Sequence, residues 1–69
     1  MKAKIYEVFC DSYARPYFYV KAFTKKSIIA QSNIKDIELI VCLGFVEDLP
    51  HINHDIDLTS EVSQWVSNI

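Results

Sequence analysis

The stretch YFYVKAFT at residues 17–24 decides the fold of this 69-residue chain. Every second side chain in it is apolar, and these three are Phe18, Val20 and Ala22. A two-residue period is that of a β-strand with one buried face. The side chains between them are then expected on the opposite face, which need not be buried: Tyr17, Tyr19 and Lys21. Residues 17–23 are therefore predicted to form a strand between the core and a face rich in tyrosine.

Thr24 provides the start of the next element. Its hydroxyl can accept a hydrogen bond from a backbone N–H two or three residues further on, which makes it a credible helix N-cap. Ile28 and Ile29 then fall within a helix of two or three turns, which Asn33 can end. A short helix is predicted to follow the strand directly.

Residues 2–10 are predicted to form the preceding strand. Their β-branched and aromatic content favours this structure, and alternation divides their side chains between two faces. One face holds Ala3, Ile5, Glu7 and Phe9, and the other holds Lys4, Tyr6, Val8 and Cys10. Residues 11–16 are mostly turn formers, and Pro16 can open a strand but not occupy its middle. A β-hairpin is the expected result.

Residues 37–46, IELIVCLGFV, are apolar on nearly every side, so periodicity alone leaves a buried strand and a buried helix both open. Branched side chains and Gly44 favour a strand, because glycine is costly inside a helix but suits a bulge or bend in a central strand. Residues 47–59 follow as an acidic connection. Ile52, Ile56 and Leu58 alternate with polar residues there, a pattern that allows a short edge strand.

The end of the chain carries the clearest helical pattern. Its apolar side chains recur at i, i+4, i+7, i+8 and i+11 and form one stripe: Leu58, Val62, Trp65, Val66 and Ile69. Thr59 or Ser60 can cap this helix. The elements together predict one domain over residues 1–69 of the α+β class. It would contain a ββαβ unit with a small, mostly antiparallel sheet, helices on one face and a C-terminal amphipathic helix.

Charge is divided sharply along the chain. All seven basic residues lie at or before Lys35, and with two acidic residues they give the first part a formal charge of +5. The remaining seven acidic residues all follow it and give −7, so the net charge of −2 hides the division. Such a chain can present a cationic face and an anionic face, or it can fold back and pair its own charges.

Composition indicates a folded protein of the cytoplasm. About half of the residues are apolar (51%), which excludes the composition of a disordered chain. Cys10 and Cys42 lie in apolar runs and are predicted to be buried, inert thiols, although one disulfide between neighbouring strands stays open. Charges near the N-terminus argue against a signal peptide, and no apolar run is long enough to span a membrane.

Candidate catalytic and metal-binding residues are few. His51 and His54 stand three positions apart beside Asp55 and Asp57, and imidazoles with carboxylates can bind a divalent metal. A solvated loop is the better interpretation of this pair, because no further ligand accompanies it. Neither cysteine has a basic neighbour in sequence, and Gly44 is the only glycine, so no phosphate loop exists. The sequence indicates no enzyme, no cofactor and no metal site.

Two surfaces remain as candidates for partner binding. One is the tyrosine face, with Tyr17, Tyr19 and Lys21. The other is the acidic connection with the start of the last helix, which holds Glu47, Asp48, Asp55, Asp57 and Glu61. An array of carboxylates can occupy a basic cleft built for phosphates and so inhibit by competition. A larger protein or complex is the expected partner, and a homodimer is a further expectation because small domains gain stability by pairing.

Nucleic-acid binding is the alternative. Arg15, Lys21, Lys25 and Lys26 combine with nearby tyrosines into the cations and stackable rings that bind single strands. The pI of about 5.5 argues against this function, because binding gains most of its energy from phosphate neutralisation.

The chain resembles the small proteins of phages and mobile elements that block host defence complexes, the anti-CRISPR proteins among them. The resemblance lies in its size, in the run YFYVKAFTKKS at residues 17–27, and in its segregated charge. It covers no diagnostic motif, so no functional residue is carried over. It implies a non-enzymatic inhibitor or accessory protein that binds a larger complex.

Overall fold

The computed structural model describes residues 2–11 and 14–59. Its elements follow the chain in the order β1 (Lys4–Cys10), β2 (Tyr17–Ala22), α1 (Lys25–Gln31), β3 (Ile37–Phe45), the 3₁₀ turn η1 (Val46–Asp48) and β4 (Ile56–Asp57). This is an α+β fold with a small sheet and one short helix among the described residues. The predicted C-terminal helix over residues 58–69 lies almost wholly outside them.

The four strands form a single mixed sheet in the order β3-β1-β2-β4. β1 pairs antiparallel with β2, as the predicted hairpin requires, and also with β3. β4 pairs parallel with β2, so the sheet is not antiparallel throughout. The predicted short edge strand within residues 47–59 is confirmed by β4.

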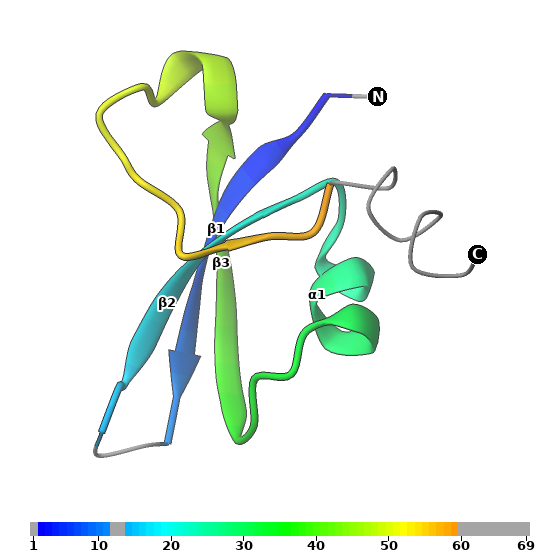
Figure 1. Cartoon of the computed structure of the whole chain (residues 1–69), viewed down its shortest axis with the longest axis vertical. Coiled ribbons are helices and arrows are strands. Elements are labelled where there is room, and N and C mark those ends of the chain that lie inside the picture. The colour runs from blue at the N-terminus through cyan, green and yellow to red at the C-terminus, as the bar shows by residue number, and fades with distance from the viewer. Residues whose placement is uncertain (1, 12–13, 60–69) are drawn as a thin grey trace, which may run out of the picture.

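One side of the sheet carries the core and α1. The alternation predicted for both hairpin strands is confirmed, because Val8 lies opposite Phe18 and Tyr6 lies opposite Val20 on this side. The buried cluster consists of Tyr6, Val8, Cys10, Val20, Ala22 and Ile28. Ile28 comes from α1, which in Figure 1 lies on one side of the sheet. The helix therefore closes the core with a single buried side chain of its own.

Thr24 caps α1 as predicted. Its backbone is extended, and its side chain accepts a hydrogen bond of 3.1 Å from the Ser27 amide. At the other end the helix finishes at Gln31, and Ser32, not Asn33, is its C-cap, with its amide donating to the Ile28 carbonyl. Of the two isoleucines in α1, Ile28 is fully buried and Ile29 is 68% exposed.

The apolar segment 37–46 is a strand over Ile37–Phe45, but it is not central. β3 lies at the edge of the sheet, and none of its nine residues is buried. The bulge expected at Gly44 is present, because the pairing with β1 shifts there and Gly44 has φ 135°. A second shift near Glu38 leaves Leu39–Cys42 as the regular part of the strand.

The connection between β3 and β4 covers part of the other side of the sheet. Ile5 points to that side, away from the core cluster, yet it is only 1% exposed. Its partner across the sheet is Gly44, and a side chain at Gly44 would lie 3.6 Å from Leu49 of the connection. Figure 1 shows this connection on the side opposite α1. Ile5 is therefore buried beneath it.

The two cysteines differ in environment. Cys10 is buried, as predicted, whereas the prediction of a buried Cys42 is wrong. Both thiols are free. Cys42 is exposed because β3 has no neighbour on its outer edge among the described residues. In the described part of the chain, no helix has the length and apolar character needed to cross a membrane.

Candidate interaction surface

Two rows of side chains cross the sheet on the side away from α1. Strand register places Leu39, Phe9 and Tyr17 side by side in one row. The next row, from β3 to β2, contains Val41, Glu7 and Tyr19. We call these six residues the open face. They lie toward the hairpin end of the sheet, beyond Ile5 and the connection that buries it.

The first row is the most accessible part of the open face. Leu39 is 55% exposed and Tyr17 is 46% exposed, and Phe9 between them is half-buried. The Tyr17 and Tyr19 rings stand edge to face, with centroids 5.8 Å apart and planes at 73°. Edge-to-face ring pairs contribute favourable energy beyond that of the area they bury. The two tyrosines therefore restrict each other's side-chain motion and form an ordered apolar surface.

Glu7 places one carboxylate in the middle of this apolar surface. It lies directly across from Tyr19, and its negative charge raises the pKa of the Tyr19 phenol, as does the hydrogen bond between the two side chains. A tyrosine phenol is protonated at neutral pH at its ordinary pKa of about 10, so Tyr19 is the donor in this hydrogen bond. The open face combines aromatic and aliphatic area with one fixed anion.

Asp55 lies beside the open face and joins the connection to β2. Its carboxylate accepts a hydrogen bond of 2.9 Å from the Tyr19 amide and an ion-paired hydrogen bond from Arg15. The backbone hydrogen bond from Tyr19 is the largest influence on the pKa of Asp55 and lowers it, burial comes next and raises it, and Arg15 lowers it further, so that the pKa is lowered overall. Asp55 is therefore a structural anion whose acceptor atoms are already used within the chain.

Two further ion pairs join the acidic segment to the basic one. Glu47 lies 2.8 Å from the Lys2 ammonium, and Asp57 lies 3.9 Å from that of Lys21. Burial acts to raise the pKa of Asp57, but the hydroxyl and amide of Thr59, together with Lys21, lower it overall. Exposed pairs of this kind each contribute about 0–1 kcal/mol.

The two charged parts of the chain therefore meet. Of the acidic residues predicted for partner binding, Glu47, Asp55 and Asp57 each lie beside a cation from the first part. Asp48 is exposed in η1, and Glu61 lies outside the described residues. The charge division is compensated within the fold over much of the acidic connection, which weakens the field available to attract a basic cleft.

The cations proposed for nucleic-acid binding are divided between the two sides of the sheet. Lys25 and Lys26 are exposed in the first turn of α1, on the core side, whereas Tyr17 and Tyr19 belong to the open face. Arg15 lies 4.7 Å from the centre of the Phe18 ring and pairs with Asp55. The described structure does not gather these cations and the tyrosines into one groove.

His51 and His54 are exposed in the connection. Within residues 2–11 and 14–59, no three histidine, cysteine or acidic side chains are grouped closely enough to hold a metal ion. Asp55 and Asp57, the carboxylates nearest the histidines in sequence, are engaged by Arg15 and Lys21.

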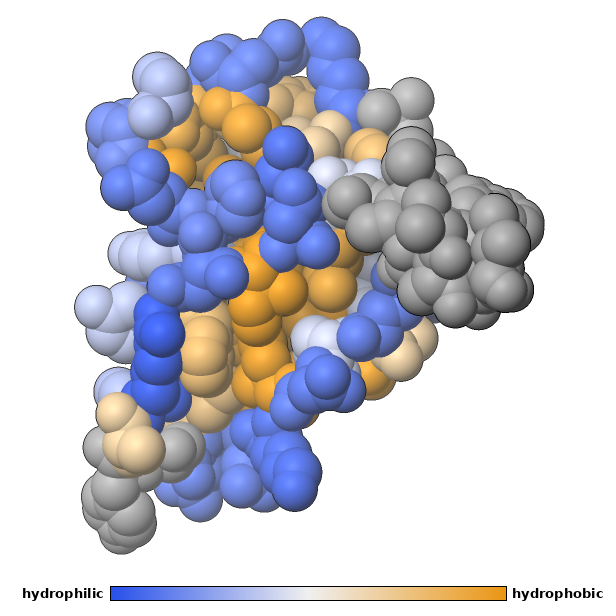
Figure 2. Space-filling model, viewed as in Figure 1, coloured by the Kyte–Doolittle hydropathy of each residue, from blue (hydrophilic) through white to orange (hydrophobic). Residues whose placement is uncertain are grey.

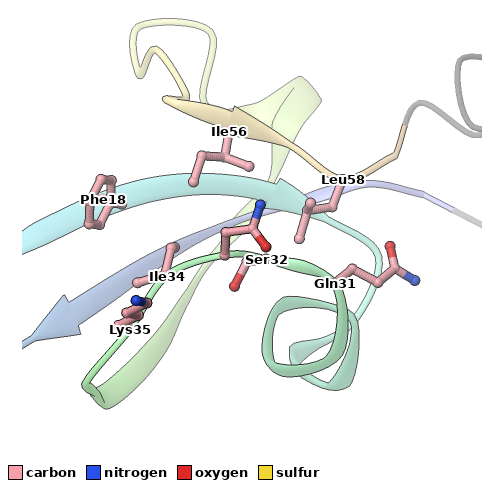
Figure 3. A pocket seen from close by; sticks show the side chains of 8 residues that line it. Phe18, Gln31, Ser32, Ile34, Lys35, Ile56 and Leu58 are labelled. Carbon is pink, nitrogen blue, oxygen red and sulfur yellow. The ribbon is translucent and has the colours of Figure 1, made fainter.

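An apolar pocket of about 430 Å³ opens on the core side of the sheet. It lies between the end of α1, β2 and β4, and Figure 3 shows Phe18, Ile34 and Leu58 around it. The described residues that line it are Phe18, Gln31, Ser32, Asn33, Ile34, Lys35, Ile56 and Leu58. In Figure 2, apolar surface lies in the middle of the view, between polar segments. Among these described residues there is no carboxylate, imidazole or thiol, so they provide no acid–base pair.

The sequence predicted the β2 part of the open face and placed Glu7 and Phe9 together on one face of the first strand, but it did not indicate the β3 part. Tyr17, Tyr19 and Lys21 do lie together on the side away from the core, as predicted. Phe9 was already expected on the face opposite Val8, and the hairpin register would have placed it beside Tyr17. Leu39 had no such signal, because segment 37–46 is apolar on both faces.

The chain is thus a small α+β protein with a mixed sheet, one open sheet face and an apolar pocket on the other side. No protein-family model, curated protein or solved structure matches it.

Proposed function

We propose that the protein is a non-enzymatic binding module that docks on a larger protein through the open face. In this role it acts as an inhibitor or an accessory subunit, the function that its resemblance to small host-defence inhibitors implies. The observation that carries the proposal is the row formed by Leu39, Phe9 and Tyr17, which leaves large apolar side chains in solvent on a firm sheet.

The composition of this face suits a protein partner. Aromatic side chains are enriched in protein interfaces, and their energy concentrates where they enter a desolvated pocket. Tyrosine loses little conformational freedom on binding because its side chain has only two rotatable bonds before the hydroxyl. Tyr17 is further restrained by its contact with Tyr19.

Glu7 gives the face a chemical preference. A carboxylate at the centre of an apolar surface matches a partner that presents an arginine or lysine surrounded by apolar side chains, because a charge buried at an interface needs an opposite charge. The proposed partner surface is therefore apolar with a central cation. The acidic connection, whose charges are largely paired with cations of the same chain, has a smaller role in this proposal and lies at the margin of the interface.

Photocrosslinking in the native cells tests the proposal directly. A photoreactive phenylalanine analogue is placed at Tyr17 on the open face or, as a control, at Ile29, which is more exposed than Tyr17 but lies on α1. We expect a covalent complex of higher mass from position 17 and none from position 29. Equal labelling from both positions, or no complex from position 17, would contradict the proposal.

We also propose that the stripe from Leu58 to Ile69 forms the terminal helix that its period predicts. Leu58 supports this proposal because it already lines the apolar pocket, where a continuing apolar stripe would find a surface to cover. Removing residues 60–69 is expected to reduce the helical circular dichroism signal and the melting temperature together. An unchanged spectrum would contradict a terminal helix.

A further inference from the structure

The outer edge of β3 is the longest strand edge in the described structure that has no neighbouring strand. β3 has nine residues, and its only partner among the described strands is β1. By contrast, the opposite edge of the sheet is the two-residue strand β4. The backbone groups along an unpaired edge are a template for a further strand.

The composition of β3 is that of a strand inside a sheet. Natural edge strands are protected by lysine, proline, inward-pointing charge or bulges. β3 contains no lysine and no proline, and its single charged residue is Glu38. Its register shifts near Glu38 and Gly44 leave Leu39–Cys42 regular. An apolar strand without lysine or proline lacks two common protections against edge pairing. β3 is therefore open to a further strand that the described chain does not supply.

We propose that a second copy of this chain pairs with β3 along this edge, antiparallel and about a two-fold axis, so that two four-stranded sheets become one continuous sheet. This inference stands independently of the proposed function. It concerns the regular segment Leu39–Cys42, because the register shifts near Glu38 and Gly44 bend the strand at either end.

Self-pairing is favoured by symmetry and charge. An antiparallel pair of identical strands has its axis perpendicular to the sheet, so every side chain meets one from the same face, and apolar residues meet apolar residues on both sides. With the axis at Ile40 or Val41, the two Glu38 positions stand at least about 14 Å apart along the strands. That distance exceeds the Debye length at physiological salt, so like charges do not oppose the dimer.

Exposure along the edge agrees with this geometry. Leu39 on the open face is 55% exposed, and Cys42 on the core side is exposed as well. Strand pairing would bring both side chains beside side chains of the second copy. The two open faces would then lie on the same side of one sheet and form a surface twice as wide.

The first test is the mass of the full chain in solution. Sedimentation velocity over a concentration series is expected to show a species of twice the 8.0 kDa monomer. Cys42→Lys places a cation on the edge of each copy and should shift the protein to monomer, while Cys42→Ser should leave the dimer intact. Melting curves of both variants establish that they fold. A wild-type protein that stays monomeric at every concentration would overturn the proposal. So would a monomer whose β3 edge pairs only with a strand of a different protein.

The second test locates the axis. Three variants carry Cys42→Ser together with one new cysteine, at Leu39, Ile40 or Val41. The wild-type protein, with Cys42 in place, tests the fourth position. Cys10 is buried and is kept in all four. A residue one position away from the axis is displaced by about 7 Å along the strands from the same residue of the second copy. The Cα atoms of these two residues are then too far apart for a disulfide. We therefore expect rapid oxidative crosslinking at one position. Ile29→Cys, at a more exposed position on α1, is the control. Equal crosslinking there, or none within Leu39–Cys42, would overturn the proposal.

Discussion

The Tyr19 amide donates a hydrogen bond of 2.9 Å to the Asp55 carboxylate, and the Asp55 amide donates one of 2.7 Å to the Tyr19 carbonyl. These reciprocal bonds attach the end of the long connection to β2, one residue before β4 begins. They also fix the backbone of a tyrosine that belongs to the open face. Asp55 therefore links the closure of the sheet to the geometry of the proposed interaction surface.

Replacing Asp55 with alanine should destabilise the fold. The change removes the carboxylate that accepts hydrogen bonds from the Tyr19 amide and from Arg15. A hydrogen bond to a charged group contributes about 1.5–3 kcal/mol, less where solvent reaches it. We expect a loss of about 1 kcal/mol in urea unfolding. Asp48→Ala, an exposed acid in η1, is the matched control and should change stability by less than about 0.5 kcal/mol. Equal effects of the two variants would contradict the assigned role.

Acid should unfold the protein partly through Asp55 and Asp57. The fold lowers the pKa of both carboxyls, so their contribution is present above the unfolded pKa of about 3.9 and is lost as pH falls through the folded values. The double variant Asp55→Asn, Asp57→Asn should show a shallower loss of stability below about pH 5 than wild type. Urea unfolding at successive pH values measures this, and identical acid slopes would rule the explanation out.

The two isoleucines of α1 should respond very differently to truncation. Ile28→Ala creates a cavity under the helix and should cost about 2–4 kcal/mol. Ile29→Ala removes a side chain that is 68% exposed and should cost less than about 0.5 kcal/mol. Chemical unfolding of both variants checks this contrast. Similar losses would mean that the face of α1 in contact with the sheet has been assigned incorrectly.

The cap of α1 gives a smaller prediction. Thr24→Ala removes the acceptor for the Ser27 amide and should destabilise the protein by about 1 kcal/mol. Thr24→Ser keeps a hydroxyl at the same place and should restore most of that stability. A serine variant as unstable as the alanine variant would show that the threonine methyl group, not the cap, is responsible.

Local elements could be predicted from the sequence because their signals are local. The alternation in residues 17–22 and the hydroxyl of Thr24 each act within a few positions, and the structure confirms the strand and the cap. Segment 37–46 was harder, since an apolar strand looks the same at the centre and at the edge of a sheet. Its position, and hence the exposure of Cys42, depends on the order of strands in space.

The meeting of the charged segments could not be predicted either. Asp55 and Arg15 are 40 positions apart, and they approach only because β4 pairs parallel with β2. A two-residue strand carries too little pattern to reveal its partner. The open face could be predicted from the sequence only in part, because Phe9 and Tyr17 become neighbours only through the hairpin register.

Affinity purification from the native cells is the most direct test of the open face as a protein-binding surface. Wild type is compared with the double variant Tyr17→Ser, Leu39→Ser, and with Ile29→Ser as the control for an exposed apolar residue elsewhere. We predict that one larger protein co-purifies in stoichiometric amount with wild type and the control and is lost from the double variant. A chain that purifies alone, or a partner retained equally by the double variant, would contradict the account.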